Sequence, residues 1–194
     1  YFHLQLNAPL LFALTRDAGG GHEFQVIRIQ ADGRLALEGA LDMGSLPGGI
    51  SEQHYPYRFL VEGDTAYLTF GPRLESGPAT LHVLSLSDPA HPCLISTVDL
   101  GEAVVGDNLR QKPHLAVVKN ASYMYVTGQF GGSAKGDLRI VDVSDPASPW
   151  IASTWDEQLG AAEMRFAGSH AYLTDRDSGL YVLDCGDPLN PAVQ

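Results

Sequence analysis

The sequence predicts an all-β protein in which a four-stranded antiparallel unit is repeated about four times. Three observations predict this fold class. A hexad that ends in a proline-containing turn recurs along the chain, and a short strand-like segment precedes each copy. In addition, 21 Gly and 12 Pro among 194 residues exclude long helices. The 44% of hydrophobic residues supply enough apolar material for a core, which excludes a disordered chain.

The hexads are the most regular element. They begin at residues 24, 81, 138 and 180, and the first copy is degenerate. The other three are followed at once by the turns Ser87-Asp-Pro-Ala-His-Pro92, Ser144-Asp-Pro-Ala-Ser-Pro149 and Gly186-Asp-Pro-Leu-Asn-Pro191. The Asp of each turn is placed to accept from backbone N–H groups two residues on, and Pro presets φ. The hexads are apolar on both faces, as expected for a strand whose sheet is stacked between two others.

Three further strand-like segments complete each unit. A second strand precedes the hexad at 66–69, 124–127 and 171–174, with a degenerate copy at 11–14. An apolar run lies upstream of it at 58–61, 115–118 and 163–166, and a fourth segment follows the turn at 93–100 and 150–154. Four-stranded units with a period above 40 residues are typical of the blades of a β-propeller.

The approximate units are 1–49, 50–103, 104–158 and 159–194, and the last is incomplete because it stops where its fourth strand should begin. Residues 1–6 look like a lone strand. This strand either completes the last unit and closes a small ring, or the chain is a fragment of a larger ring. We favour the fragment, since rings of four blades are uncommon.

The hexad with its turn, Leu138-Arg-Ile-Val-Asp-Val-Ser-Asp-Pro-Ala-Ser-Pro149, resembles the LVIVD-type repeat. The resemblance is good over about 57–194 and poor over 1–56. It implies a bacterial or archaeal β-propeller that is often extracellular or attached to the cell surface. It implies no particular activity, because propellers carry many unrelated functions.

Composition restricts the partners. The net charge of −11 disfavours nucleic acid and anionic membrane surfaces, whose binding needs Lys and Arg. No apolar run is long enough to cross a membrane as a helix, so we expect no membrane insertion. A protein or glycan partner fits an acidic extracytoplasmic repeat protein better. We expect Cys93 and Cys185 to be unpaired and buried.

The irregular segments all belong to one end of the predicted blades. The turns after the hexads are short and alike, whereas the loops before the hexads and the connectors between units differ in length and sequence. Binding residues tend to lie on variable loops held by a rigid scaffold, so the site is expected at this loop-rich end.

The connectors lead into the innermost strands at the mouth of the central channel. Polar residues there are the candidate ligand contacts: His54, Tyr57, Arg58, Lys112, His114 and Glu163. We align Leu115 with Arg58 and Glu163. The alternative is that Tyr57 and His114 only fill the channel and bond backbone carbonyls. His22, in a Gly-rich loop, belongs either to a flexible hairpin or to a mobile ligand-binding loop.

Three interpretations of the function remain open. The sequence contains no Gly-x-Ser-x-Gly, His-Glu-x-x-His or Cys-x-x-Cys motif, so we predict no catalytic residue and no cofactor. The first function is a non-catalytic extracytoplasmic module that binds a protein, glycan or small ligand. The alternative is a metal-dependent hydrolase or oxidoreductase, with a divalent metal held by His54, His114 and Glu163. A scaffold without a ligand is the third and least specific interpretation.

Overall fold

The computed structural model describes residues 3–16, 21–47, 54–72, 76–103, 115–130, 136–159, 161–175 and 179–194. Within these ranges the chain forms four antiparallel sheets of four strands each, together with one short 3₁₀ helix, η1 (Met43–Ser45). Sheet I contains β1 (His3–Asn7), β2 (Leu10–Arg16), β3 (His22–Ile29) and β4 (Leu35–Asp42). Sheet II contains β5 (His54–Glu62), β6 (Thr65–Pro72), β7 (Gly77–Ser85) and β8 (Cys93–Ala103).

Sheet III contains β9 (Ala116–Asn120), β10 (Tyr123–Gly128), β11 (Gly136–Asp142) and β12 (Trp150–Leu159). Sheet IV contains β13 (Ala161–Ala167), β14 (His170–Asp175), β15 (Gly179–Asp184) and β16 (Ala192–Val193). In every sheet the strands are paired in chain order. The recurring hexads form most of β3, β7, β11 and β15, and the last residue of the three regular copies follows the strand.

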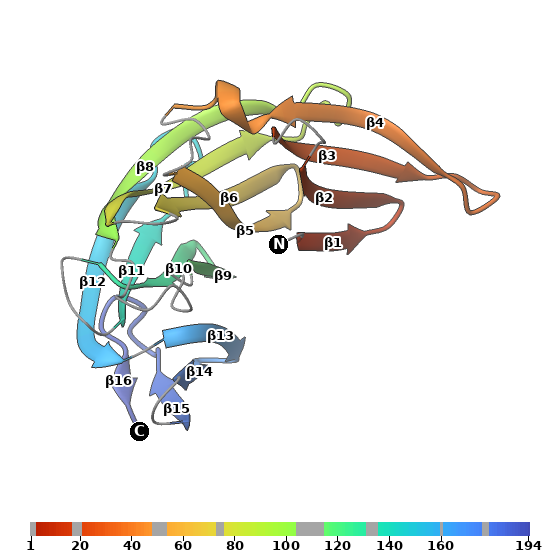
Figure 1. The fold of residues 1–194 in the computed structure, drawn as a ribbon. Coiled ribbons are helices and arrows are strands. Elements are labelled where there is room, and N and C mark those ends of the chain that lie inside the picture. Colours follow the sequence, from red (N-terminus) through yellow and green to blue (C-terminus); the bar gives the residue numbers. More distant parts are fainter. Residues whose placement is uncertain are drawn as a thin grey trace.

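The four sheets fan out around a common axis along an arc that does not close (Figure 1). The first strands β1, β5, β9 and β13 lie on the inner side and contact one another in order, while β4, β8 and β12 form the outer rim. This is the arrangement of propeller blades, and it confirms the predicted fold class.

The pairing of the first and last strands speaks against the alternative in which residues 1–6 complete the last unit. The N-terminal strand β1 pairs with β2, so it is the innermost strand of sheet I and does not complete the last unit. The fourth strand of the last unit does begin, because Ala192 and Val193 of β16 pair with β15.

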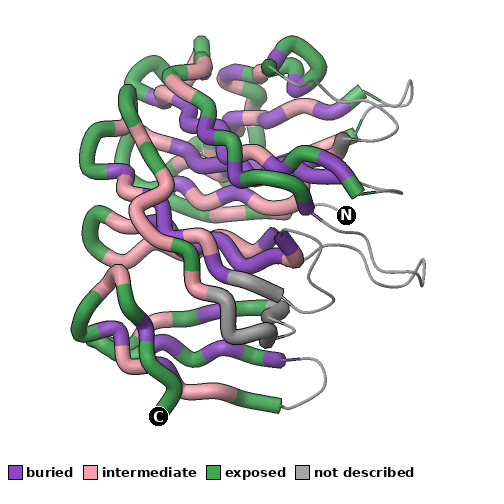
Figure 2. The backbone as a smooth tube through the Cα atoms, turned by 90° about the vertical axis from the view of Figure 1, so that its left-hand side faces the viewer, coloured by how far each residue is buried: buried purple, intermediate pink, exposed green. Residues whose placement is uncertain are grey.

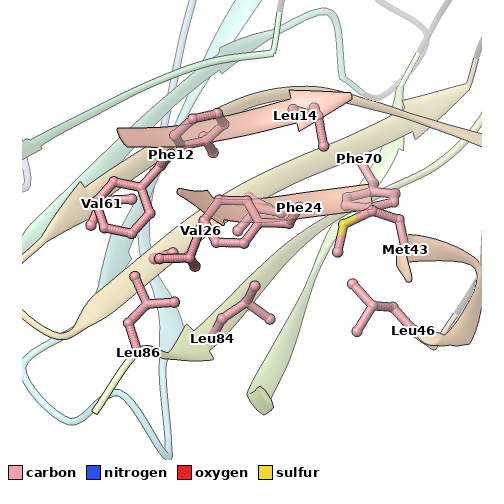
Figure 3. Close-up of a cluster of buried hydrophobic side chains, with 13 residues drawn as sticks. Phe12, Leu14, Phe24, Val26, Met43, Leu46, Val61, Phe70, Leu84 and Leu86 are labelled. Atoms are coloured by element: carbon pink, nitrogen blue, oxygen red, sulfur yellow. The ribbon is translucent and has the colours of Figure 1, made fainter. Parts of the chain in front are cut away.

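The cores lie between the sheets. Between sheets I and II, Phe12 and Phe24 pack in one buried cluster with Val61 and Phe70 (Figure 3). Phe59 belongs to the same cluster, and its ring meets that of Phe24 edge-on at 5.3 Å. Separate buried clusters join sheet II to III and sheet III to IV. Buried positions run through the middle of the strands and the tight turns are exposed (Figure 2). Both faces of the inner sheets are therefore apolar, which explains the continuous apolar hexads.

The Asp-Pro turns have the predicted hydrogen bonds. The side chains of Asp88, Asp145 and Asp187 accept from the backbone N–H two residues on, at 2.9–3.0 Å. Each turn also docks on the preceding sheet. Ser96 of β8 donates to the carbonyl of Pro146 at 2.7 Å, and Tyr125 of β10 donates to that of Pro188 at 3.0 Å.

Gly39 of β4 receives the first of these turns. A Cβ at this position would lie 2.2 Å from the carbonyl oxygen of Pro89, so only glycine allows the contact. Strand register places Gly39 opposite Val26 in sheet I and Ser96 opposite Val83 in sheet II, and in each sheet a bulge follows this pair. Gly39 and Ser96 are therefore equivalent positions, and each contacts the turn of the next sheet. The recurring turn is thus also the contact by which one sheet holds the next.

The outward faces of sheets I and IV are exposed. By register, Leu4 in β1 corresponds to Phe59 in β5 and Met164 in β13. Phe59 and Met164 are 1% exposed, whereas Leu4 is 61% exposed. On sheet IV, Tyr172 corresponds to the buried Tyr125, yet it is 40% exposed. Both faces have the residue pattern of an inter-sheet contact.

Cys93 and Cys185 are both free. Cys185 is buried as expected, but Cys93 is exposed, because it begins the outer-rim strand β8 immediately after a turn. Across the described part of the chain, no helix has the length and hydropathy needed to cross a membrane.

Candidate functional site

The site lies where the innermost strands begin. In an antiparallel sheet paired in chain order, the start of the first strand, the end of the second and the start of the third lie at one end. This is the loop-rich end, opposite the Asp-Pro turns. Strand register aligns His3 with Leu14, Arg58 with Thr69, and Glu163 with Thr174, so His3, Arg58 and Glu163 hold equivalent positions in sheets I, II and IV.

Sheet III departs from the expected alignment. Thr127 pairs with Ala116, so Ala116 and not Leu115 is the equivalent of Arg58 and Glu163. The pairing shifts by one residue before Arg58 and again before Glu163, and Leu115 precedes β9. A sequence alignment without gaps cannot see such bulges.

Two arginines meet one carboxylate at this end. Arg58 Nη2 lies 3.5 Å from Glu163 Oε1, and Arg165 Nη2 lies 3.4 Å from Glu163 Oε2. All three side chains remain open to water, with exposed fractions of 38% for Arg58, 49% for Glu163 and 71% for Arg165. Residues 105 positions apart thus form an ion pair between sheets II and IV.

His3 completes the group, which we call the axial cluster: His3, Arg58, Glu163 and Arg165. The backbone N–H of Phe59 donates to Nδ1 of His3 at 3.1 Å, and the imidazole packs on the Phe59 ring at 4.5 Å. An accepting Nδ1 carries no proton, so the ring is neutral with its proton on Nε2. Burial, and then the positive charge of Arg58, lower the pKa of His3 below its ordinary value.

Threonines at the ends of the second strands hold the cluster backbone. The Thr69 hydroxyl lies 3.3 Å from the carbonyl oxygen of Arg58. In sheet IV, the N–H of Glu163 donates to the Thr174 hydroxyl at 3.1 Å. The last residue of the recurring Ala-Tyr-Leu-Thr segment therefore contacts the backbone of Arg58 in sheet II and of Glu163 in sheet IV.

The other predicted site residues fall into two groups. The Tyr57 hydroxyl donates to the carbonyl of Pro72 at 2.5 Å, and its ring packs against the core between sheets II and III. His54 begins β5, but its side chain is outside the described residues. Lys112 and His114 also lie outside them.

His22 differs from both of its interpretations. It is the first residue of β3, is only 4% exposed, and packs edge-on against Tyr55 at 4.7 Å. It is therefore part of the contact between sheets I and II.

The sequence did not single out His3 or Arg165 as site residues. His3 stands in the strand of the weakest repeat, and only its pairing with Leu14 shows that it matches Arg58. Arg165 follows Glu163 by two residues in one strand, and the period of two places both side chains on one face. That alternation was the available signal.

No metal site is evident in the parts of the chain described by the structure, where no three His, Cys, Asp or Glu residues gather. The predicted set of His54, His114 and Glu163 is not covered by this statement, because the two histidine side chains are not described.

The repeats match a known family. The family model of the LVIVD repeat matches residues 120–157 and 161–194, that is, most of sheet III and all of sheet IV. The chain carries LVIVD repeats. A comparison with curated proteins finds no match.

The LVIVD-repeat chain also resembles a solved structure, the periplasmic gluconolactonase of Pseudomonas aeruginosa, with a TM-score of 0.68 at 14% sequence identity. The likeness covers 98% of this chain and 55% of the gluconolactonase chain, so the present chain spans about half of that protein. At this identity the likeness establishes the propeller fold alone.

Proposed function

We propose that this chain is a non-catalytic binding module that takes its ligand at the loop-rich end of the propeller axis. The meeting of Arg58 and Glu163 from sheets II and IV is the observation that carries the proposal. Charged side chains brought together from distant segments, and still open to water, present donors and acceptors to a bound molecule at a fixed spacing. Among a protein, a glycan and a small ligand, such a compact polar group best suits a small ligand or the end of a glycan.

The proposal includes an extracytoplasmic location. It is supported by the LVIVD repeat, by the fold shared with a periplasmic protein and by the acidic composition.

The binding proposal is tested with a panel of glycans and small metabolites, screened by thermal shift and verified by calorimetry. We expect at least one ligand whose binding is lost in Arg58→Ala and kept in Arg28→Ala. Arg28 is the matched control, since it also pairs with a glutamate, Glu38, but lies in the third strand of sheet I. Ligands that bind equally to both variants would refute an axial site.

A metal-dependent propeller enzyme is the second candidate, favoured by the likeness to a gluconolactonase. Metal analysis of the purified chain separates the two functions. Stoichiometric divalent metal that is lost in the His54→Ala/His114→Ala variant supports the enzyme, and a metal-free chain supports the binding module.

A further inference from the structure

The charge of the axial cluster restricts its ligand. Arg58 and Arg165 each carry one positive charge, Glu163 carries one negative charge, and His3 is neutral because its Nδ1 accepts from Phe59. The cluster therefore has a net charge of +1 in a chain whose net charge is −11. A single negative charge on the ligand balances the cluster, whereas a dianion would leave an excess of negative charge in an already acidic protein.

The arginines retain capacity for a ligand. Their distances of 3.4 and 3.5 Å to Glu163 exceed the roughly 2.7–2.9 Å of a tight charge-assisted hydrogen bond. Each guanidinium has five N–H donors in a planar fork, which matches a carboxylate group. Arg165 uses one nitrogen on the carbonyl of Met164 at 2.7 Å, which restrains its position.

The remaining two groups recognise hydroxyls. The Glu163 carboxylate only accepts hydrogen bonds, so its complement is an O–H donor. His3 offers Nε2–H, whose complement is an oxygen lone pair. A hydroxyl group satisfies either one.

From these features we propose that the axial cluster binds a small hydroxylated monocarboxylate, with the carboxylate at Arg58 and Arg165 and hydroxyls at Glu163 and His3. The inference rests on the proposed function and names the ligand class for the same site.

The test uses three probes on the whole 194-residue chain: gluconate, sorbitol and hexanoate. Sorbitol has the hydroxylated chain of gluconate without its carboxylate, and hexanoate has a carboxylate without hydroxyls. We expect gluconate to bind at least about tenfold more tightly than either, since each missing set of charged hydrogen bonds is worth about that factor. Calorimetry at low ionic strength gives the affinities. Raising the salt concentration should weaken the binding of gluconate, because salt screens its charge from the arginines.

Variants assign the roles. Arg165→Ala should lower the affinity for gluconate by about tenfold or more. Arg165→Lys keeps the positive charge and should lose less of the affinity, and Arg28→Ala should leave the affinity unchanged. Glu163→Gln should raise the affinity for hexanoate, because the cluster then carries a net charge of +2. The ratio of the affinities for gluconate and hexanoate should therefore become smaller. Arg165 is exposed, so an unchanged melting temperature of its variants is expected.

Two results would overturn the ligand class. Equal affinities for sorbitol and gluconate would show that the carboxylate plays no role in binding. If Arg58→Ala then abolished the binding of both probes, the axial binding site of the proposed function would still be supported. Absence of binding for all three probes would also refute the hydroxylated monocarboxylate. In that case the wider panel with Arg58→Ala and Arg28→Ala still decides the proposed function.

Discussion

Thr69 donates a hydrogen bond of 2.8 Å to the carbonyl of Leu115, 46 residues further along the chain. The same hydroxyl lies 3.3 Å from the carbonyl of Arg58. The fully buried Leu115 side chain lies against Gly71 and Gly128, where an added Cβ would approach it to 2.6 and 2.8 Å. One hydroxyl thus connects sheet II, the entry to sheet III and the backbone of the axial cluster.

Replacing Thr69 by Val keeps the volume and removes the hydroxyl. We expect a loss of about 1–3 kcal/mol in the free energy of unfolding, because Thr69 is fully buried and the Leu115 carbonyl loses its partner. Urea unfolding measures this loss. The control is Thr174→Val in sheet IV, an exposed position where water replaces the hydroxyl and the change should stay within about 0.5 kcal/mol. Similar losses in the two variants would contradict the role of burial.

The Asp145→Ala variant removes the side-chain acceptor of one Asp-Pro turn. The bond to the Ala147 N–H is 2.9 Å long, and its loss should lower the free energy of unfolding by about 1 kcal/mol. For a chain of this length, the melting temperature should fall by roughly 2–4 °C. Ligand binding should be unchanged, because the turn lies at the end opposite the axial cluster. A loss of binding at an unchanged melting temperature would contradict the placement of the site.

Phe59 and Leu4 occupy equivalent positions and should respond differently to truncation. Phe59→Ala should cost about 3–5 kcal/mol, because the ring is buried between sheets I and II. Leu4→Ala should cost less than about 1 kcal/mol, since Leu4 is 61% exposed. Chemical denaturation of both variants gives the comparison. A large loss for Leu4→Ala would show that a partner covers this face in solution.

His3 should make stability depend on pH. Burial lowers its folded-state pKa below the ordinary 6.5, so the unfolded chain takes up the proton first as the pH falls. The contribution is complete above about pH 6.5 and is lost as the pH falls from there towards the folded-state pKa. Protonation of Nδ1 would also remove the acceptor for the Phe59 N–H.

Unfolding free energies measured between about pH 5 and 8 test this dependence. His3→Asn keeps an acceptor near the Phe59 N–H but does not titrate, so part of the slope should disappear. His170→Asn, at an exposed position, serves as the control. An unchanged slope in His3→Asn would contradict the assignment.

Much of the fold could be predicted from the sequence, because its signals are local. Strand alternation, Gly and Pro breakers and the Asp-Pro turn act within a few residues, and their repetition identifies the unit. The hydrogen bonds of Asp145 illustrate this, since donor and acceptor are two residues apart. The bulges before Arg58 and Glu163 were missed, because each depends on the strand opposite.

The axial cluster required the tertiary structure. Arg58 and Glu163 were candidates because the sequence predicts each near the start of an innermost strand. Their contact depends on how sheets II, III and IV fan around the axis. Strand register shows that His3 is their equivalent in sheet I, and its contacts with Phe59 hold it beside sheet II. The sequence by itself determined the repeat, the strands, the turns and the end that carries the irregular loops, all set by neighbours along the chain. Only the tertiary structure decided which polar side chains meet. Contacts across the axis depend on the rotation of each sheet relative to the one before it, and a pattern of neighbouring residues does not specify these rotations.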